Sequence, residues 1–108
     1  MSSFTQSKHG LFGSLKAQPG QADALTALLL EASQLVSTAP GCHIYLVSRD
    51  PQDEAVVWVT EVWDTEQDHA NSLHVTGVRE LISRAMPLLA GPPEKGRVLQ
   101  VLGGKGLD

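Results

Sequence analysis

Residues 55–63 read AVVWVTEVW, a β-branched and aromatic run that is typical of a strand. Because side chains alternate along a strand, one face carries Val57, Val59 and Trp63, and the other carries Val56, Trp58 and Val62. A strand that is apolar on both faces needs cover on both sides. Helices on one face of a sheet would leave the other face as an exposed apolar patch, which isolated monomers rarely tolerate. We therefore predict a homodimer formed through the open sheet face.

Strand and helix signals precede this segment. Residues 42–48 (CHIYLVS) predict another strand, and the turn-forming sequence RDPQD at 49–53 joins the two strands in a hairpin. Farther upstream, apolar residues recur at three- and four-residue intervals over 22–36, which predicts a helix that stops at Pro40. A first strand, interrupted by glycine, is expected over His9 to Ala17.

Further elements follow the segment. A capping arrangement at residues 65–68 predicts a short helix over Glu66 to Leu73. The apolar spacing of residues 76–89 predicts a second helix, bent or ended by Pro87, and residues 97–102 (RVLQVL) predict the last strand. The order strand, helix, strand, strand, helix, strand indicates an α+β fold of the ferredoxin-like βαββαβ type, with a four-stranded antiparallel sheet and helices on one face.

Length and composition limit the possible classes of protein. The 108 residues suit a single domain over 1–108, and we expect the leader 1–8 and the tail 104–108 to be mobile. The net charge of −4, with scattered basic residues, disfavours nucleic acid as a partner. No apolar run approaches the roughly 20 residues of a membrane span. The N-terminus has no signal-peptide pattern, and the lone Cys42 cannot form an intrachain disulfide, so we expect a cytoplasmic location.

Three short motifs follow one another along the chain. They are Pro40-Gly41-Cys42 before a strand with Tyr45, Thr60-Glu61-Val62-Trp63 at a strand end, and TEQDHANSL over residues 65–73. Their order and spacing resemble those of the antibiotic biosynthesis monooxygenase family of dimeric α+β barrels, over residues 10–104. The resemblance implies a cofactor-independent monooxygenase that uses dioxygen on a quinol-like or other electron-rich aromatic small molecule. It also implies a ligand pocket between the sheet and its own helices, and a reaction that needs neither flavin nor metal.

Three residues are candidates for catalysis: His69, Trp63 and Glu61. The family places a pocket-lining aromatic residue at the position of Trp63, although a core tryptophan is the alternative. His69 shares its helix face with Leu73, which we expect to face the core, so His69 should also point toward the sheet. An imidazole can accept a phenolic proton near neutral pH. Its alternative role is a buried histidine bonded to a backbone carbonyl or to Glu61. Glu61 either acts as a base or pairs with Arg79 or Arg84.

Four residues are candidates for substrate binding: Tyr45, Val59, Ser72 and His74. Tyr45 orients a ligand oxygen or lies at the dimer interface. Val59 stands where characterised oxygenases of the family carry an asparagine, Ser72 stands where many relatives carry the histidine, and His74 is close to that place. The missing amide favours an alternative function, a non-catalytic dimer that binds a small aromatic ligand, or a scaffold dimer with a filled pocket. The spacing of the four histidines predicts no metal site.

Overall fold

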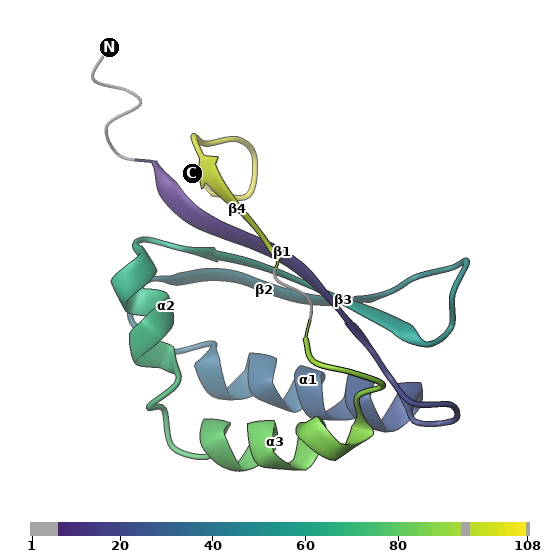
Figure 1. The fold of residues 1–108 in the computed structure, drawn as a ribbon. Coiled ribbons are helices and arrows are strands. Elements are labelled where there is room, and N and C mark those ends of the chain that lie inside the picture. The colour runs from purple at the N-terminus through teal and green to yellow at the C-terminus, as the bar shows by residue number, and fades with distance from the viewer. Residues whose placement is uncertain (1–6, 94–95, 108) are drawn as a thin grey trace.

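The computed structural model describes residues 7–93 and 96–107. All the predicted strands and helices are present and lie in the predicted order (Figure 1). They are β1 (Lys8–Lys16), α1 (Ala22–Val36), β2 (Cys42–Arg49), β3 (Val56–Trp63), α2 (Glu66–Ser72), α3 (Val78–Ala85), the 3-10 turn η2 (Met86–Leu88) and β4 (Arg97–Val101). The helical run in the second half changes to 3-10 geometry at Met86, because Pro87 lacks the N–H that an α-helix needs.

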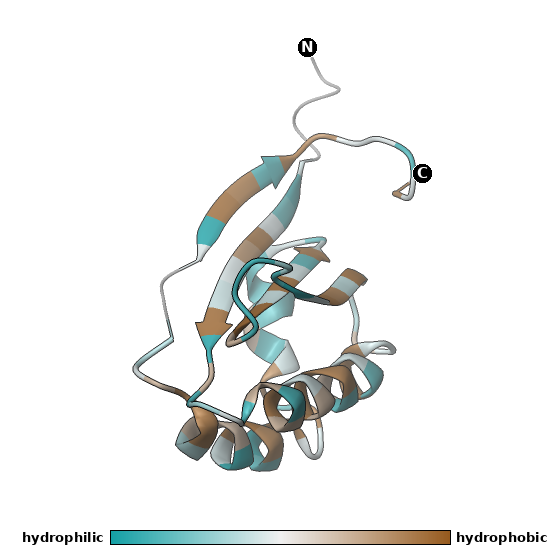
Figure 2. Cartoon of the chain, turned by 90° about the vertical axis from the view of Figure 1, so that its right-hand side faces the viewer, coloured by the Kyte–Doolittle hydropathy of each residue, from teal (hydrophilic) through white to brown (hydrophobic). Residues whose placement is uncertain are grey.

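The four strands form one antiparallel sheet in the order β2-β3-β1-β4. Helices α1 and α3 lie side by side against one face of this sheet, and α2 follows the end of β3 (Figure 1). Figure 2 shows the strand layer and the helix layer from the side, with hydrophobic residues on both. This arrangement confirms the prediction of a ferredoxin-like α+β fold with helices on one face.

The chain ends differ slightly from the predicted boundaries. β1 begins at Lys8, inside the segment expected as a leader, while residues 1–6 and Asp108 lie outside the described residues. The mobility of the leader and the tail therefore stays a prediction. None of the helices in the described part of the chain combines the length and the hydropathy needed to cross a bilayer.

The helix-facing side of β3 is packed at its two ends and open between them. Val57 belongs to a buried cluster with Leu25 of α1, and Trp63 belongs to a second cluster with Val36. The two residues between them on the same face, Val59 and Glu61, are only half-buried. Two separate core clusters thus leave a space over the middle of the sheet, where a ligand site can form.

The opposite face of the sheet is largely exposed among the described residues of this chain, although Val62 on that face is buried. The register pairs Ser48 with Trp58, and Leu46 with Thr60, so these side chains share that face. Leu46, Trp58 and Leu99 of β4 are exposed there. The two-faced pattern of β3 is therefore present in the fold as predicted.

Candidate active site

A polar centre lies under the sheet where β3 meets α2. The Nε1–H of Trp63 donates a hydrogen bond to Oε1 of Glu61, with the two atoms 3.0 Å apart. The Nε2 atom of His69 is 3.6 Å from the same oxygen, and the rings of His69 and Trp63 meet edge to face with centroids 5.7 Å apart. The Glu61 side chain is 15% exposed and that of His69 is 30% exposed. One partly desolvated carboxylate is thus hydrogen-bonded to the indole and lies next to the imidazole.

The sequence of the β3–α2 connection brings these groups together. Only two residues separate Trp63 from the start of α2, and the side chain of Thr65 caps the helix by accepting from the backbone N–H of Asp68 at 3.0 Å. This cap fixes the helix register, so that His69, one turn along, lies against the end of β3. The predicted capping arrangement is confirmed.

Gly41 supports this connection from the preceding turn. Its carbonyl accepts from the backbone N–H of Asp64 at 2.8 Å, and its φ is +82°. A Cβ at this position would collide with the carboxyl group of Asp68 in α2. Glycine is therefore required both for the backbone conformation and for the close approach of α2.

Two cavities meet at the polar centre. The inner cavity, of about 150 Å³, lies among α1, α2 and α3, and the outer cavity, of about 400 Å³, is lined by residues of β1 and β3 and by Pro93 and Gly96. Four residues line both cavities: Leu29, Tyr45, Glu61 and His69. A ligand that occupies the junction of the two cavities would therefore lie beside Glu61, His69 and Tyr45.

Tyr45 faces the helices from β2, paired in register with Glu61. The alternative that it lies at an interface on the open sheet face is therefore wrong. Burial raises the pKa of its hydroxyl, and the negative charge of Glu61 raises it further. Burial and then Glu61 also raise the pKa of the neighbouring Cys42 thiol. Tyr45 consequently keeps its proton near neutral pH and can donate a hydrogen bond to an anionic oxygen of a ligand.

The structure gathers most, but not all, of the candidate residues. Ser72 lines the inner cavity and Val59 lines the outer cavity, whereas Trp63 is fully buried and lines neither. Of the two alternatives for Trp63, a pocket wall or a core tryptophan, the structure favours the core, because its indole packs in the buried cluster with Val36 and Val78. His74 is also absent from both linings. It is exposed, with Nδ1 3.3 Å from Nη2 of Arg79.

The expected partner of Glu61 was wrong. Its contacts are Trp63 and His69, rather than Arg79 or Arg84. A half-buried carboxylate needs a charged or hydrogen-bonding partner, and the sequence offered the arginines of α3. The indole N–H two positions along the same strand meets that need locally instead, since residues i and i+2 share a face.

Sequence reasoning missed His9. It lies opposite Trp63 on β1, and its ring centroid is 6.2 Å from that of His69. The sheet register alone brings the two imidazoles together, since 60 positions of the chain separate them. The only signal in the sequence was a polar residue at the start of a strand that ends up beside the central strand.

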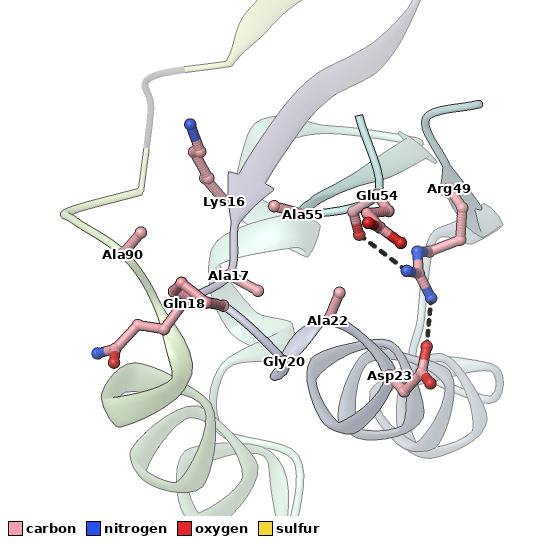
Figure 3. A pocket seen from close by; sticks show the side chains of 11 residues that line it. Lys16, Ala17, Gln18, Gly20, Ala22, Asp23, Arg49, Glu54, Ala55 and Ala90 are labelled. Atoms are coloured by element: carbon pink, nitrogen blue, oxygen red, sulfur yellow. Dashed lines mark hydrogen bonds and ion pairs between the residues drawn. The ribbon is translucent and has the colours of Figure 1, made fainter. Parts of the chain in front are cut away.

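A larger cavity, of about 480 Å³, lies at the far end of β1, around the turn into α1 (Figure 3). Two of its charged side chains, Arg49 and Asp23, form an ion pair. Arg49 donates to Asp23 Oδ1 at 2.9 Å and to the carbonyl of Glu54 at 2.8 Å. The guanidinium of Arg49 and the carboxylate of Asp23 are therefore engaged with each other. Among residues 7–93 and 96–107, no cluster of three or more histidine, cysteine or acidic side chains could hold a metal ion.

Comparison with known proteins assigns the family. Residues 10–82 match the family described as antibiotic biosynthesis monooxygenase, and the chain belongs to this family. A solved structure from Chloroflexus aurantiacus J-10-fl, described as a "putative Antibiotic biosynthesis monooxygenase", is 39% identical with a TM-score of 0.84, over 94% of this chain and 100% of that chain.

Two more distant structures share the fold. A protein of the same description from Caulobacter crescentus CB15 is 24% identical with a TM-score of 0.80, over 89% of this chain and 91% of that one. A conserved protein from Methanosarcina mazei Go1 is 12% identical with a TM-score of 0.80, over 94% and 99% of the two chains. No protein with curated annotation matches the sequence.

Proposed function

We propose that the protein is a cofactor-independent monooxygenase that acts on a hydroxylated, electron-rich aromatic molecule with dioxygen. The observation that carries this proposal is the position of His69 and Glu61 at the junction of two cavities. An imidazole beside a carboxylate can accept a phenolic proton, because the carboxylate stabilises the imidazolium that forms. Family membership and the monooxygenase descriptions of its structural relatives agree with this assignment.

The reaction balances without a further reductant. His69 takes the hydroxyl proton, and the phenolate gives electron density to dioxygen as a C–O bond forms at a ring carbon. The peroxide on that carbon receives the proton from His69. Loss of the C–H proton from the same carbon to His69 then breaks the O–O bond and leaves C=O and hydroxide, which leaves as water with the proton from His69. The substrate gives up four electrons, and the two oxygen atoms end in the product and in water.

Tyr45 supplies a donor that Val59 lacks. Val59 offers no amide to hold the substrate oxygen, but Tyr45, on the neighbouring strand, lines both cavities and keeps its hydroxyl proton. The same missing amide favours the second candidate, a dimer that binds an aromatic ligand without turning it over. Thermal shift separates the two: a ligand at 100 times its dissociation constant adds about 2.7 kcal/mol of stability. Stabilisation without oxygen uptake would identify a binding protein.

Oxygen uptake tests the enzymatic proposal directly. We would measure it with dihydroxynaphthalenes in the presence of a chelator, after subtracting autoxidation, for the native protein and the H69Q variant. General-base catalysis contributes about 10²- to 10⁴-fold, so H69Q should lose at least about 100-fold in rate. H43Q is the matched control, since His43 is also bonded to a carboxylate but lines neither cavity. Uptake in H69Q equal to that in H43Q would remove the imidazole from the mechanism.

We also propose that two copies pair through the open sheet face, in the cytoplasm, where the single Cys42 stays reduced. The exposed Leu46, Trp58 and Leu99 side chains support this pairing. Sedimentation at low micromolar concentration should give a dimer, and L46R should give a monomer. L30R is the control, because Leu30 is equally exposed but lies on α1. A native monomer, or L30R dissociating like L46R, would overturn this proposal.

A further inference from the structure

The inner cavity is apolar except for Ser72, whose hydroxyl donates to the backbone carbonyl of His69, and for the boundary with the outer cavity. Its walls come from α1 and α3, with Leu28, Ala32 and Val36 on one helix and Val78, Leu81 and Ala85 on the other. Its polar lining residues include Tyr45, Glu61 and His69, which the outer cavity shares. A charged or strongly hydrated group would lose its hydration among these helices without a partner. The inner cavity therefore suits an apolar group attached to something anchored at the junction.

The outer cavity is larger than the inner one and is lined mainly by strand residues. It is about 400 Å³, within the usual range for a small-molecule site, and it runs along β1 past Gly13, opposite Val59. Gly13 presents no side chain to this cavity, and Gly96 borders it: a Cβ built at position 13 would lie in van der Waals contact with the Cα of Gly96, 3.5 Å away. A cavity wall with two glycines and no side chains at these positions suits a flat ring system.

We propose that the substrate carries a short apolar branch next to its ionisable hydroxyl, with the ring in the outer cavity and the branch in the inner cavity. The proposal rests on the proposed function for the identity of the hydroxylated ring. The hydroxyl then lies at the junction, within reach of His69 and Tyr45, because those residues line both cavities. When the branch and the hydroxyl are on adjacent ring carbons, the branch can enter the inner cavity while the hydroxyl stays at the polar boundary between the two cavities.

The size of the inner cavity sets the length of the branch. A protein cavity of about 150 Å³ lined by aliphatic side chains is large enough to hold benzene, so about six carbon atoms fill the inner cavity. Each buried methylene tightens binding about fourfold. Beyond that length the branch reaches Leu73 and Ile82, which line the cavity and are themselves exposed, and further methylenes would enter water.

A chain-length series tests the proposal. The probes are 1-naphthols with a linear alkyl group at carbon 2, from no carbons to eight, titrated by calorimetry under nitrogen so that no turnover occurs. For the native protein we expect the dissociation constant to fall about fourfold per methylene up to about six carbons and then level off. An affinity that does not change with chain length overturns the proposal.

Two variants locate the branch. A32L fills part of the inner cavity with three further carbons, so the six-carbon probe should bind about sixtyfold more weakly, while unbranched 1-naphthol is unchanged. A85L is a second variant that fills the same cavity from α3. The matched control is A27L, because Ala27 is exposed on the same helix and lines neither cavity. Thermal unfolding of each variant confirms that it is folded, and equal length profiles in A32L, A85L and A27L would overturn the assignment.

This experiment does not depend on catalysis. If the native protein consumes no oxygen with any probe but shows the length profile, the enzymatic proposal fails and the branch site stands. If oxygen uptake requires His69 but binding ignores branch length, the enzymatic proposal stands and the branch site fails.

Discussion

The hydrogen bond between Trp63 and Glu61 should be one of the strongest single contributions to the stability of this domain. Trp63 is 0% exposed, and its Nε1–H donates to a carboxylate oxygen 3.0 Å away whose side chain is itself largely shielded from water. W63F keeps most of the ring but removes this donor. E61Q keeps an acceptor but removes the charge. The two substitutions together form a double-mutant cycle on one bond.

The expected magnitudes follow from this geometry. A hydrogen bond to a charged group contributes about 1.5–3 kcal/mol, and the smaller ring of W63F leaves a void that costs about 1 kcal/mol more. W63F should therefore lower the free energy of unfolding by about 3 kcal/mol. In the E61Q background the bond is neutral and contributes about 1 kcal/mol, so the same substitution should cost about 1 kcal/mol less.

Urea unfolding of the native protein, the two single variants and the double variant measures the coupling. All four should be compared at one protein concentration, because association shifts apparent stability. Distant, independent sites add within about 0.3–0.5 kcal/mol. Strict additivity within that range would show that the indole and the carboxylate do not stabilise each other, and would refute the stabilising role assigned to this hydrogen bond.

Three further predictions concern pH and backbone conformation. The native protein should lose stability above about pH 10, because Tyr45 keeps its proton in the fold while an unfolded tyrosine ionises. The Y45F variant should lose less stability over this range. Urea midpoints of the native protein that do not change between pH 8 and 10.5 would contradict the prediction. G41A should destabilise the protein by more than 2 kcal/mol, since an alanine at φ +82° is strained and its Cβ would collide with the carboxyl group of Asp68 in α2. The control G20A, at φ +78° with open space around it, should cost only about 1 kcal/mol. Equal losses of stability in thermal unfolding would exclude the collision with Asp68. The hydrogen bond from His43 holds the pKa of Asp64 below its usual range. The stability that ionised Asp64 contributes is therefore present above the pKa of about 4 in the unfolded chain, and is lost as the pH falls through the lower pKa of the folded state. D64N should lose less stability than the native protein between pH 6 and 2, and parallel stability curves would show that this pair does not contribute to acid unfolding.

Local patterns in the sequence were enough to define the elements of this fold. The period-two and three-to-four-residue apolar spacings, the Thr65 cap and the Pro40 stop each act over a few residues, so the helices and strands lie within a residue or two of their expected bounds. The two-faced apolar pattern of β3 likewise appears directly as a packed face and an open face.

The site was only partly predictable for the same reason. The sequence placed His69 and Glu61 near each other because a strand end and the next helix are joined by two residues. It could not show which partner Glu61 takes, because an arginine on a later helix and an indole on the same strand are both compatible with the pattern. Nor could it separate a pocket wall from a core position for Trp63, since both require a large apolar residue.

What the sequence determined by itself is therefore the order of the elements and the faces of each one, because periodicity, capping and turn chemistry act between near neighbours. The tertiary structure alone decided that His9 lies beside His69, that Tyr45 faces the helices, and that two core clusters leave a pair of cavities between them. These features depend on strand register and on the packing of α1 against α3, which arise from contacts between residues far apart in the chain.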